Sequence, residues 1–255
     1  MADRTRMLAP YIFAIALFLI WEIGTRVFDV SVYVLPRPSQ FFGTLYEFWD
    51  GISFHATQTL LTTLVGFAIG VSAGAVLGAA CGASRTVYAT IYPALIGFYS
   101  IPKVALVPIF VIWFGSGTAP ALLTSTVICI FPVLVNVATG VATTERDMED
   151  VLRSLGGSRF DILRHVSLPR SLPYFFASLK VAISLAFVGT VISETVAANR
   201  GIGTMMVSAS ADFDVPLVFA GLVLLAAMGI CMYAAFALVE RRMVGWAKRD
   251  VDFTH

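Results

Sequence analysis

Few residues in this sequence have the type and spacing to carry out chemistry. His55 and His165 stand apart from any Ser, Cys or carboxylate arrangement that would activate a nucleophile. The three cysteines, Cys81, Cys129 and Cys231, are odd in number and show no spacing typical of a metal site or a disulfide framework. No G-x-x-x-x-G-K-S/T loop is present, so the chain does not bind ATP by that device. The sequence therefore predicts no catalytic residue and no metal site, and an energy source must lie on another chain.

Ionisable side chains inside apolar segments are the remaining candidates for a functional site. One long apolar stretch contains Lys103 directly after Pro102, with a further proline on either side. Non-helical backbone at membrane depth is tolerated only where it is buried in protein or lines a cavity. We therefore expect Tyr99, Ser100 and Lys103 to line a translocation path, with Glu194 as a further candidate. Alternatives stay open, because Lys103 could snorkel to the interface and Glu194 could have an exposed or hydrogen-bonded structural role.

The elements that must position these residues are membrane helices. A chain that is 58% hydrophobic and 13% charged, with a mean hydropathy of +0.85, is not a soluble domain. The sequence predicts an all-α membrane protein with one domain over residues 1–255. Apolar runs long enough to cross a slab of about 30 Å predict six transmembrane helices, at 7–28, 57–82, 88–115, 118–139, 171–197 and 215–239. The aromatic-rich segment 29–54 is predicted to include a short interfacial helix.

The distribution of Lys and Arg sets the expected orientation. Both ends of a six-span chain lie on one side, and placing them in the cytoplasm leaves only Arg26, Arg37 and Arg200 outside. The basic residues on the cytoplasmic side are then Arg4, Arg6, Arg85, Arg146, Arg153, Arg159, Arg164, Arg170, Arg241, Arg242, Lys248 and Arg249. Lys103 and Lys180 fall inside spans. A cleavable signal peptide over the first run is the alternative, but no small-residue cleavage site follows it.

The second apolar run carries a glycine at every fourth position. These glycines are Gly66, Gly70, Gly74, Gly78 and Gly82. Small residues at this spacing form a face on which another helix can approach closely. We expect this face to serve helix packing, with intrachain contact favoured over a dimer seam.

The charged loop 143–170 separates two apolar runs and carries its own helix signals. Met148, Val151, Leu152 and Leu155 follow i, i+3, i+4, i+7 spacing and predict one apolar stripe on a short helix. Thr144 is the expected N-cap, with Asp147 at the third helical position.

Two glycines are expected to end this first helix of the loop, because Gly156 and Gly157 can adopt the left-handed stop that other residues resist. Ser158 is then expected to cap a second short helix that has Asp161 at its third position. Pro169 is expected to end that second helix.

An apolar stripe on an otherwise charged helix needs a partner surface. A groove on another protein would fit it, as in helix-in-groove recognition. An interfacial helix lying on lipid headgroups would fit it equally, since periodicity alone does not identify the partner.

The loop resembles the EAA loop of ABC importer permeases. In D-V-L-R-S-L-G, followed by V-S-L-P, Gly156, Leu168 and Pro169 stand at the spacing of that family. Asp150 replaces the usual Glu, while Val151 and Leu152 replace the two alanines. Four further motifs, at 35–39, 101–108, 113–115 and 199–203, are similar to the nitrate, sulfonate, taurine and thiamine-precursor branch of these permeases.

This resemblance implies a type I ABC importer permease fold and a transporter subunit rather than an enzyme. Two such subunits, expected as a homodimer, would assemble in the bacterial inner membrane with two ATPase subunits and an external substrate-binding protein. ATP and Mg²⁺ would bind the ATPase, leaving this chain with no cofactor and no nucleic acid partner. The residues that would couple it to the ATPase are Met148, Asp150, Val151, Leu152, Leu155, Gly156, Gly157, Leu168 and Pro169. A stand-alone channel or secondary transporter is the alternative function, although no inverted repeat is evident.

Overall fold

The computed structural model describes residues 2–143 and 146–244, and every element within them is helical. In chain order the elements are α1 (Ala2–Val27), α2 (Pro38–Glu47), α3 (Trp49–Gly82), α4 (Arg85–Ser100), the 3₁₀ helix η1 (Lys103–Leu106), α5 (Val107–Phe114), α6 (Thr118–Ala142), α7 (Arg146–Ser154), α8 (Arg159–Ile162), the π-helix η2 (Leu163–Ser167), α9 (Leu168–Ala197), α10 (Ile202–Ala211) and α11 (Val215–Met243). The all-α fold predicted from the sequence is confirmed.

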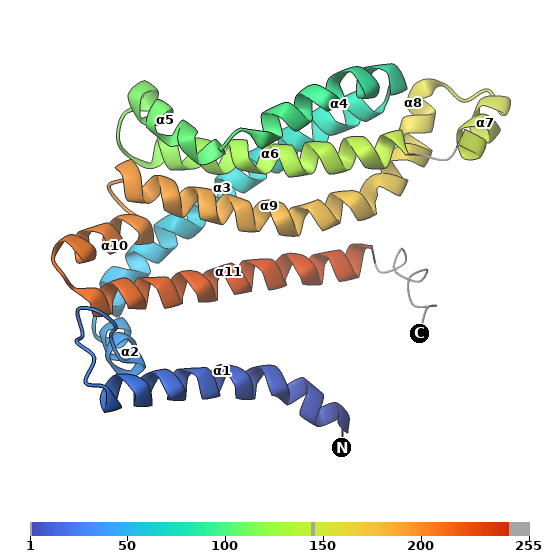
Figure 1. Cartoon of the computed structure of the whole chain (residues 1–255). Helices are drawn as coiled ribbons and strands as arrows, with labels where there is room; N and C mark the ends of the chain where they lie inside the picture. The colour runs from blue at the N-terminus through green and yellow to red at the C-terminus, as the bar shows by residue number, and fades with distance from the viewer. Residues whose placement is uncertain (1, 144–145, 245–255) are drawn as a thin grey trace.

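Helices α6, α9 and α11 run side by side, α3 crosses behind them obliquely, and α3, α6 and α9 pack against one another (Figure 1). Within the described residues, four helices are long and apolar enough to cross a membrane, the third of them extending from Phe160 to Ala197. Thr86–Ser100 and Lys103–Phe114 add a fifth span if this bent pair is counted as one. The backbone of α1 is helical over residues 7–27 of the predicted first span, 7–28. The count of six spans stays a prediction.

The glycine face of α3 packs against α6 of the same chain. A Cβ added at Gly74 would lie 2.7 Å from the Ile130 carbonyl oxygen, and one at Gly78 would lie 2.7 Å from that of Leu134. A Cβ added at any of the other three glycines of the repeat would lie 2.7 Å or less from an atom of α6. The repeat thus makes close contacts within one chain, as the favoured interpretation of intrachain packing expects.

A second core joins the start of α3 to α2, α10 and α11. Phe41 of α2 is completely buried and its ring lies 5.4 Å from that of Trp21. The short helix predicted in segment 29–54 is present as α2, but its central aromatic side chain is buried among other helices. This core holds the α2–α10 end of the bundle together.

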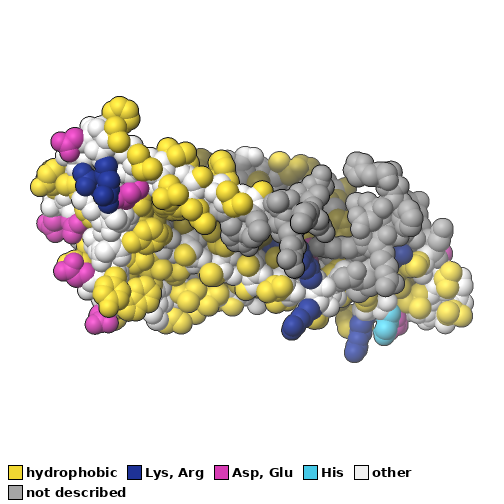
Figure 2. All heavy atoms as spheres, turned by 90° about the horizontal axis from the view of Figure 1, so that it is seen from below, with side chains coloured by type: hydrophobic (Ala, Val, Ile, Leu, Met, Phe, Trp, Pro, Cys, Tyr) yellow, Lys and Arg dark blue, Asp and Glu magenta, His cyan; other side chains and the backbone are white. Residues whose placement is uncertain are grey.

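The two ends of the bundle differ in what they carry. The start of α1, the end of α11 and helix α7 all lie at one end, and α2 and α10 lie at the other (Figure 1). Seen from below, hydrophobic side chains cover much of the visible surface between the two ends, acidic and basic side chains gather at the left end, and further basic side chains and a histidine lie toward the right (Figure 2). Exposed residues of the middle include Phe13 and Ile20 of α1 and Ile230 of α11. This distribution suits a protein whose flanks face lipid.

Candidate functional site

The predicted apolar stripe of the 143–170 loop is formed on α7 and largely faces away from the chain. Leu155, Val151 and Met148 are 79%, 61% and 42% exposed. Leu152 is half-buried, because it lies against Gly157. Thr144, the expected N-cap, lies outside the described residues. Met148 and Val151 are thus open on a short helix whose other residues are mostly polar, and the exposed Leu155 directly follows it.

The Gly-Gly turn after α7 has the geometry predicted for it. Gly156 has a φ of +84°, in the left-handed region that favours glycine. Its N–H donates to the Arg153 carbonyl, and the Gly157 N–H donates to the Leu152 carbonyl, both at 2.9 Å. These two bonds make a Schellman motif, which satisfies the last carbonyls of the helix. The turn therefore fixes the direction in which the chain leaves α7.

The second half of the loop begins with a reciprocal cap, also as predicted. The Ser158 N–H donates to the Asp161 carboxylate at 2.9 Å, and the Asp161 N–H donates to the Ser158 hydroxyl oxygen at 3.2 Å. This is the arrangement of a capping box.

The expected stop at Pro169 is wrong. From α8 the chain continues through η2 into α9, giving one helix of 38 residues from Phe160 to Ala197. Pro169 lies in the first turn of α9, where η2 has already changed the hydrogen-bond pattern from i→i+4 to i→i+5. Because a proline in such a position breaks no intrahelical bond, it marks a junction. The loop is thereby joined rigidly to a central helix.

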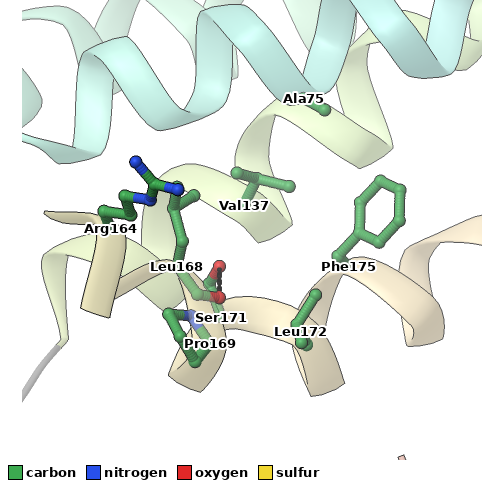
Figure 3. A pocket seen from close by; sticks show the side chains of 8 residues that line it. All are labelled: Ala75, Val137, Arg164, Leu168, Pro169, Ser171, Leu172 and Phe175. Carbon is green, nitrogen blue, oxygen red and sulfur yellow. Dashed lines mark hydrogen bonds between the residues drawn. The ribbon is translucent and has the colours of Figure 1, made fainter. Parts of the chain in front are cut away.

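An apolar groove lies beneath this junction (Figure 3). Its volume is about 380 Å³. The residues that line it are Ala75 of α3, Val137 of α6, Arg164 of η2, and Leu168, Pro169, Ser171, Leu172 and Phe175 of α9. The Ser171 hydroxyl donates to the Leu168 carbonyl at 2.8 Å, so it needs no further partner. Leu168 and Pro169 of the predicted coupling set therefore contact the bundle, whereas Val151 and Leu155 face outward.

The break in the third span brings three of the four predicted path residues together. α4 and the η1–α5 segment meet at an angle of 76°, next to Pro102. The Lys103 ammonium donates to the Tyr99 carbonyl and lies 4.1 Å from the centre of the Tyr99 ring. It also lies 5.3 Å from the ring of Phe131 on α6, a contact that sequence reasoning missed. Ser100 is exposed at the same break. At this break the Lys103 ammonium is therefore held over the rings of Tyr99 and Phe131.

Glu194 lies in a different set of contacts. Its side chain is 2% exposed, and one carboxylate oxygen accepts from the Thr59 hydroxyl at 2.9 Å and from the Gly203 N–H at 3.1 Å. The structure therefore places it between α3 and α10. Among the alternatives left open by the sequence, its geometry fits the hydrogen-bonded structural role.

One charged pair was missed by sequence reasoning. Lys180 of α9 lies 2.5 Å from the carboxylate of Glu240 on α11. The two residues are 60 positions apart, and no local spacing connects them. Each side chain of the pair neutralises the charge of the other, which would be costly to leave alone in an apolar surrounding.

Comparisons with known proteins agree with this fold. Residues 70–245 match the family described as binding-protein-dependent transport system inner membrane component. The formylaminopyrimidine transport permease protein ThiX of Halalkalibacterium halodurans is 30% identical, over 95% of this chain and 97% of its own length. The riboflavin transport system permease protein RibX of Chloroflexus aurantiacus is 34% identical, over 90% of this chain and 87% of its own. SsuC of Escherichia coli K12, a putative aliphatic sulfonates transport permease, is 27% identical over 93% of this chain and 91% of its own length.

Solved structures show the same fold. The MetNI methionine ABC transporter in an inward-facing conformation has a TM-score of 0.61 at 18% identity, covering 79% of this chain and 98% of that one. An amino acid ABC transporter gives a TM-score of 0.62 with the same coverage. Since the family match covers most of the sequence and relatives align along nearly its whole length, the chain belongs to the binding-protein-dependent transport system inner membrane components and is the multi-pass permease subunit of an ABC transporter, not an enzyme.

Proposed function

We propose that the apolar stripe of α7 docks this permease onto an ATPase subunit. The observation that carries the proposal is the exposure of Val151 and Leu155 on a helix that is otherwise polar and is held by a Schellman turn. Fully burying a side chain of this size stabilises a complex by about 1.5–3 kcal/mol. Two such side chains would anchor the helix in an apolar groove of the ATPase.

The loop can transmit force as well as bind. The capping box fixes α8, and η2 continues α8 into α9 without a break. A displacement of the loop by ATP-driven closure of the ATPase pair would therefore move α9 as a rigid body. In this proposal ATP and Mg²⁺ bind the ATPase chains, and the permease itself holds no cofactor.

Docking is tested by placing a charge in the stripe. Val151→Asp should reduce copurification of the ATPase at least about tenfold, because an ionised carboxylate would be buried in an apolar groove without a partner. Val34→Asp is the matched control, since Val34 is 73% exposed and lies outside the loop. Normal copurification with Val151→Asp, together with weaker retention on lipid vesicles, would show that the stripe lies on headgroups instead.

The assembly proposed around the chain is a homodimer of permeases with two ATPase subunits and an external binding protein. Both termini and α7 would lie in the cytoplasm, which the shared end of α1, α11 and α7 supports. A cysteine introduced by Leu155→Cys should react with an impermeant maleimide only from the cytoplasmic side, and one introduced by Ser210→Cys only from outside. The unsubstituted chain controls for labelling of its own cysteines, and the opposite pattern would overturn the orientation.

The proposed cargo is a small heteroaromatic solute. Support comes from the Lys103 ammonium over the rings of Tyr99 and Phe131, where a flat ring can stack and meet a positive charge. ThiX and RibX are named for formylaminopyrimidine and riboflavin, which both contain such rings. A sulfonate, as named for SsuC, is the second candidate because the same ammonium would attract its anionic group. Tyr99, Ser100 and Lys103 would line the path, with Glu194 supporting it from the neighbouring helices.

A further inference from the structure

Three successive backbone N–H groups at the start of α10 each meet a side-chain acceptor from another helix. The Gly201 N–H donates to Nδ1 of His55 at 3.0 Å, and the Ile202 N–H donates to the Thr59 hydroxyl at 2.9 Å. The Gly203 N–H donates to the Glu194 carboxylate at 3.1 Å. His55 and Thr59 are four residues apart on α3, so they share one face of that helix. We call these three acceptors, His55, Thr59 and Glu194, the α10 cradle.

The cradle is closed by further contacts that leave little freedom. The Thr59 hydroxyl donates to the same Glu194 oxygen at 2.9 Å, so α3 and α9 are also bonded to each other. Gly201 has a φ of +127°, and a Cβ there would lie 2.2 Å from the Glu194 carboxyl carbon. Only glycine can adopt that backbone conformation and leave that space. The Thr204 hydroxyl donates to the Glu194 carbonyl at 3.1 Å, which fastens α10 to the last turn of α9.

The cradle lies at one end of α9, and the predicted coupling loop lies at the other. The helix between them is continuous from Phe160 to Ala197. At the cradle end, the Ala197 carbonyl also accepts from the Gly117 N–H at 2.9 Å, which connects α9 to the start of α6. A displacement at the loop is therefore delivered to α3, α6 and α10 through these bonds.

We infer that the α10 cradle is a clamp that makes α3, α9 and α10 move as one body, so that His55, Thr59 and Glu194 are positioning residues for coupling ATP hydrolysis to opening at the far end of the bundle. This inference rests on the proposed docking of the 143–170 loop. A clamp of hydrogen bonds suits the task, because hydrogen bonds in a buried site fix both the distance and the direction between the groups that they join. Opening the clamp would leave the Thr59 hydroxyl and the second Glu194 oxygen without these partners, in addition to Glu194 Oε1, which already has no hydrogen-bond partner within the described residues, and this cost favours the closed clamp.

The test uses the assembled transporter with its ATPase in lipid bilayers. A cysteine introduced by Ser210→Cys on α10 reports on the cradle end through its rate of reaction with maleimide. Trapping the ATPase with ATP and orthovanadate should change that rate by at least about threefold when α3, α9 and α10 move together. Thr59→Val removes the central hydroxyl at nearly constant volume and should abolish the nucleotide-dependent change while ATPase copurification stays normal.

Two further variants on α3 separate clamping from a general loss of packing. Thr63→Val is the matched control: Thr63 is fully buried one turn further along, and its hydroxyl has no hydrogen-bond partner within the described residues. It should respond to nucleotide as the parent chain does. Thr59→Ser restores the hydroxyl and should restore the response.

Several results would overturn the inference. A nucleotide-dependent change that persists in Thr59→Val would show that the cradle only caps α10. A parent chain whose Ser210→Cys labelling ignores nucleotide would overturn it equally, even where normal ATPase copurification leaves the docking proposal standing. If Thr59→Val does not assemble, His55→Phe removes a different acceptor at a half-buried position, and a normal response in that variant would exclude a clamp.

Discussion

The seam between α3 and α6 and the turn after α7 both depend on glycine, for opposite reasons. At Gly74 the backbone is ordinary helix, but an added Cβ would lie 2.7 Å from the Ile130 carbonyl oxygen. At Gly156 nothing lies within 4 Å of an added Cβ, but φ is +84°. The first glycine is required by the lack of space and the second by the backbone conformation.

This difference separates the part of the chain that holds the fold from the part available to a partner. In the seam, apolar surface is buried within one chain and two backbones touch. In the loop, the turn holds an apolar stripe whose large side chains stay exposed. Substitutions in the seam should therefore act on folding, and substitutions in the turn should act on association with the chain intact.

The largest effect is expected in the seam. Gly74→Val should prevent correct packing of α3 on α6, because overpacking costs about 1–3 kcal/mol for each poorly fitted group and backbone cannot move aside cheaply. The yield of monodisperse protein in detergent should fall steeply. Gly51→Val is the matched control, since Gly51 lies on the same helix with nothing within 4 Å of an added Cβ. Equal yields from both variants would show that the seam tolerates separation.

A smaller effect is expected in the turn. Gly156→Val should leave the yield of folded permease unchanged but lower ATPase copurification roughly tenfold, because a left-handed conformation costs about 1–2 kcal/mol for a residue with a Cβ. Asn tolerates that conformation better than other residues. Gly156→Asn should therefore retain most of the association. If Val and Asn behave alike at this position, backbone conformation is not what the turn requires.

The same contrast explains how much of this molecule could be predicted from its sequence. The glycine repeat of α3 and the Gly-Gly turn were both predictable, because spacing and residue type carry the reason for each. The Ser158–Asp161 capping box was predictable for the same reason, since its partners are three residues apart. Apolar runs also located the long helices, although α3 begins at Trp49, earlier than its apolar run, because hydrogen bonding continues through polar residues.

What could not be predicted depends on contacts distant in sequence or on a local competition. The α10 cradle joins Thr59 to Ile202, a separation of 143 positions, and nothing in either segment indicates the other. The prediction that the helix stops at Pro169 failed for a different reason. A proline usually ends the helix before it, but here the π turn of η2 accommodates Pro169 and the helix goes on.

The smallest effect should appear at the break in the third span, where neither space nor backbone conformation is at issue. Lys103 lies over the rings of Tyr99 and Phe131, and a cation in such a place contributes about 0.5–1 kcal/mol at an exposed site. Lys103→Met and Lys103→Gln should both raise the KM for uptake about two- to fivefold, with normal yield and normal ATPase copurification.

Reconstituted transporter, supplied with the solute that its external binding protein retains, gives this measurement. Lys103→Arg keeps the positive charge over the rings and should stay close to the parent value. For a heteroaromatic cargo, Lys103→Met and Lys103→Gln should raise the KM by similar factors, since both remove the charge that faces its ring. For a sulfonate, Lys103→Gln should raise the KM less than Lys103→Met does, because the Gln amide can still donate to an anionic oxygen. Unchanged kinetics in both variants would mean that Lys103 snorkels to the interface, so the broken span would have to bind its cargo through other residues.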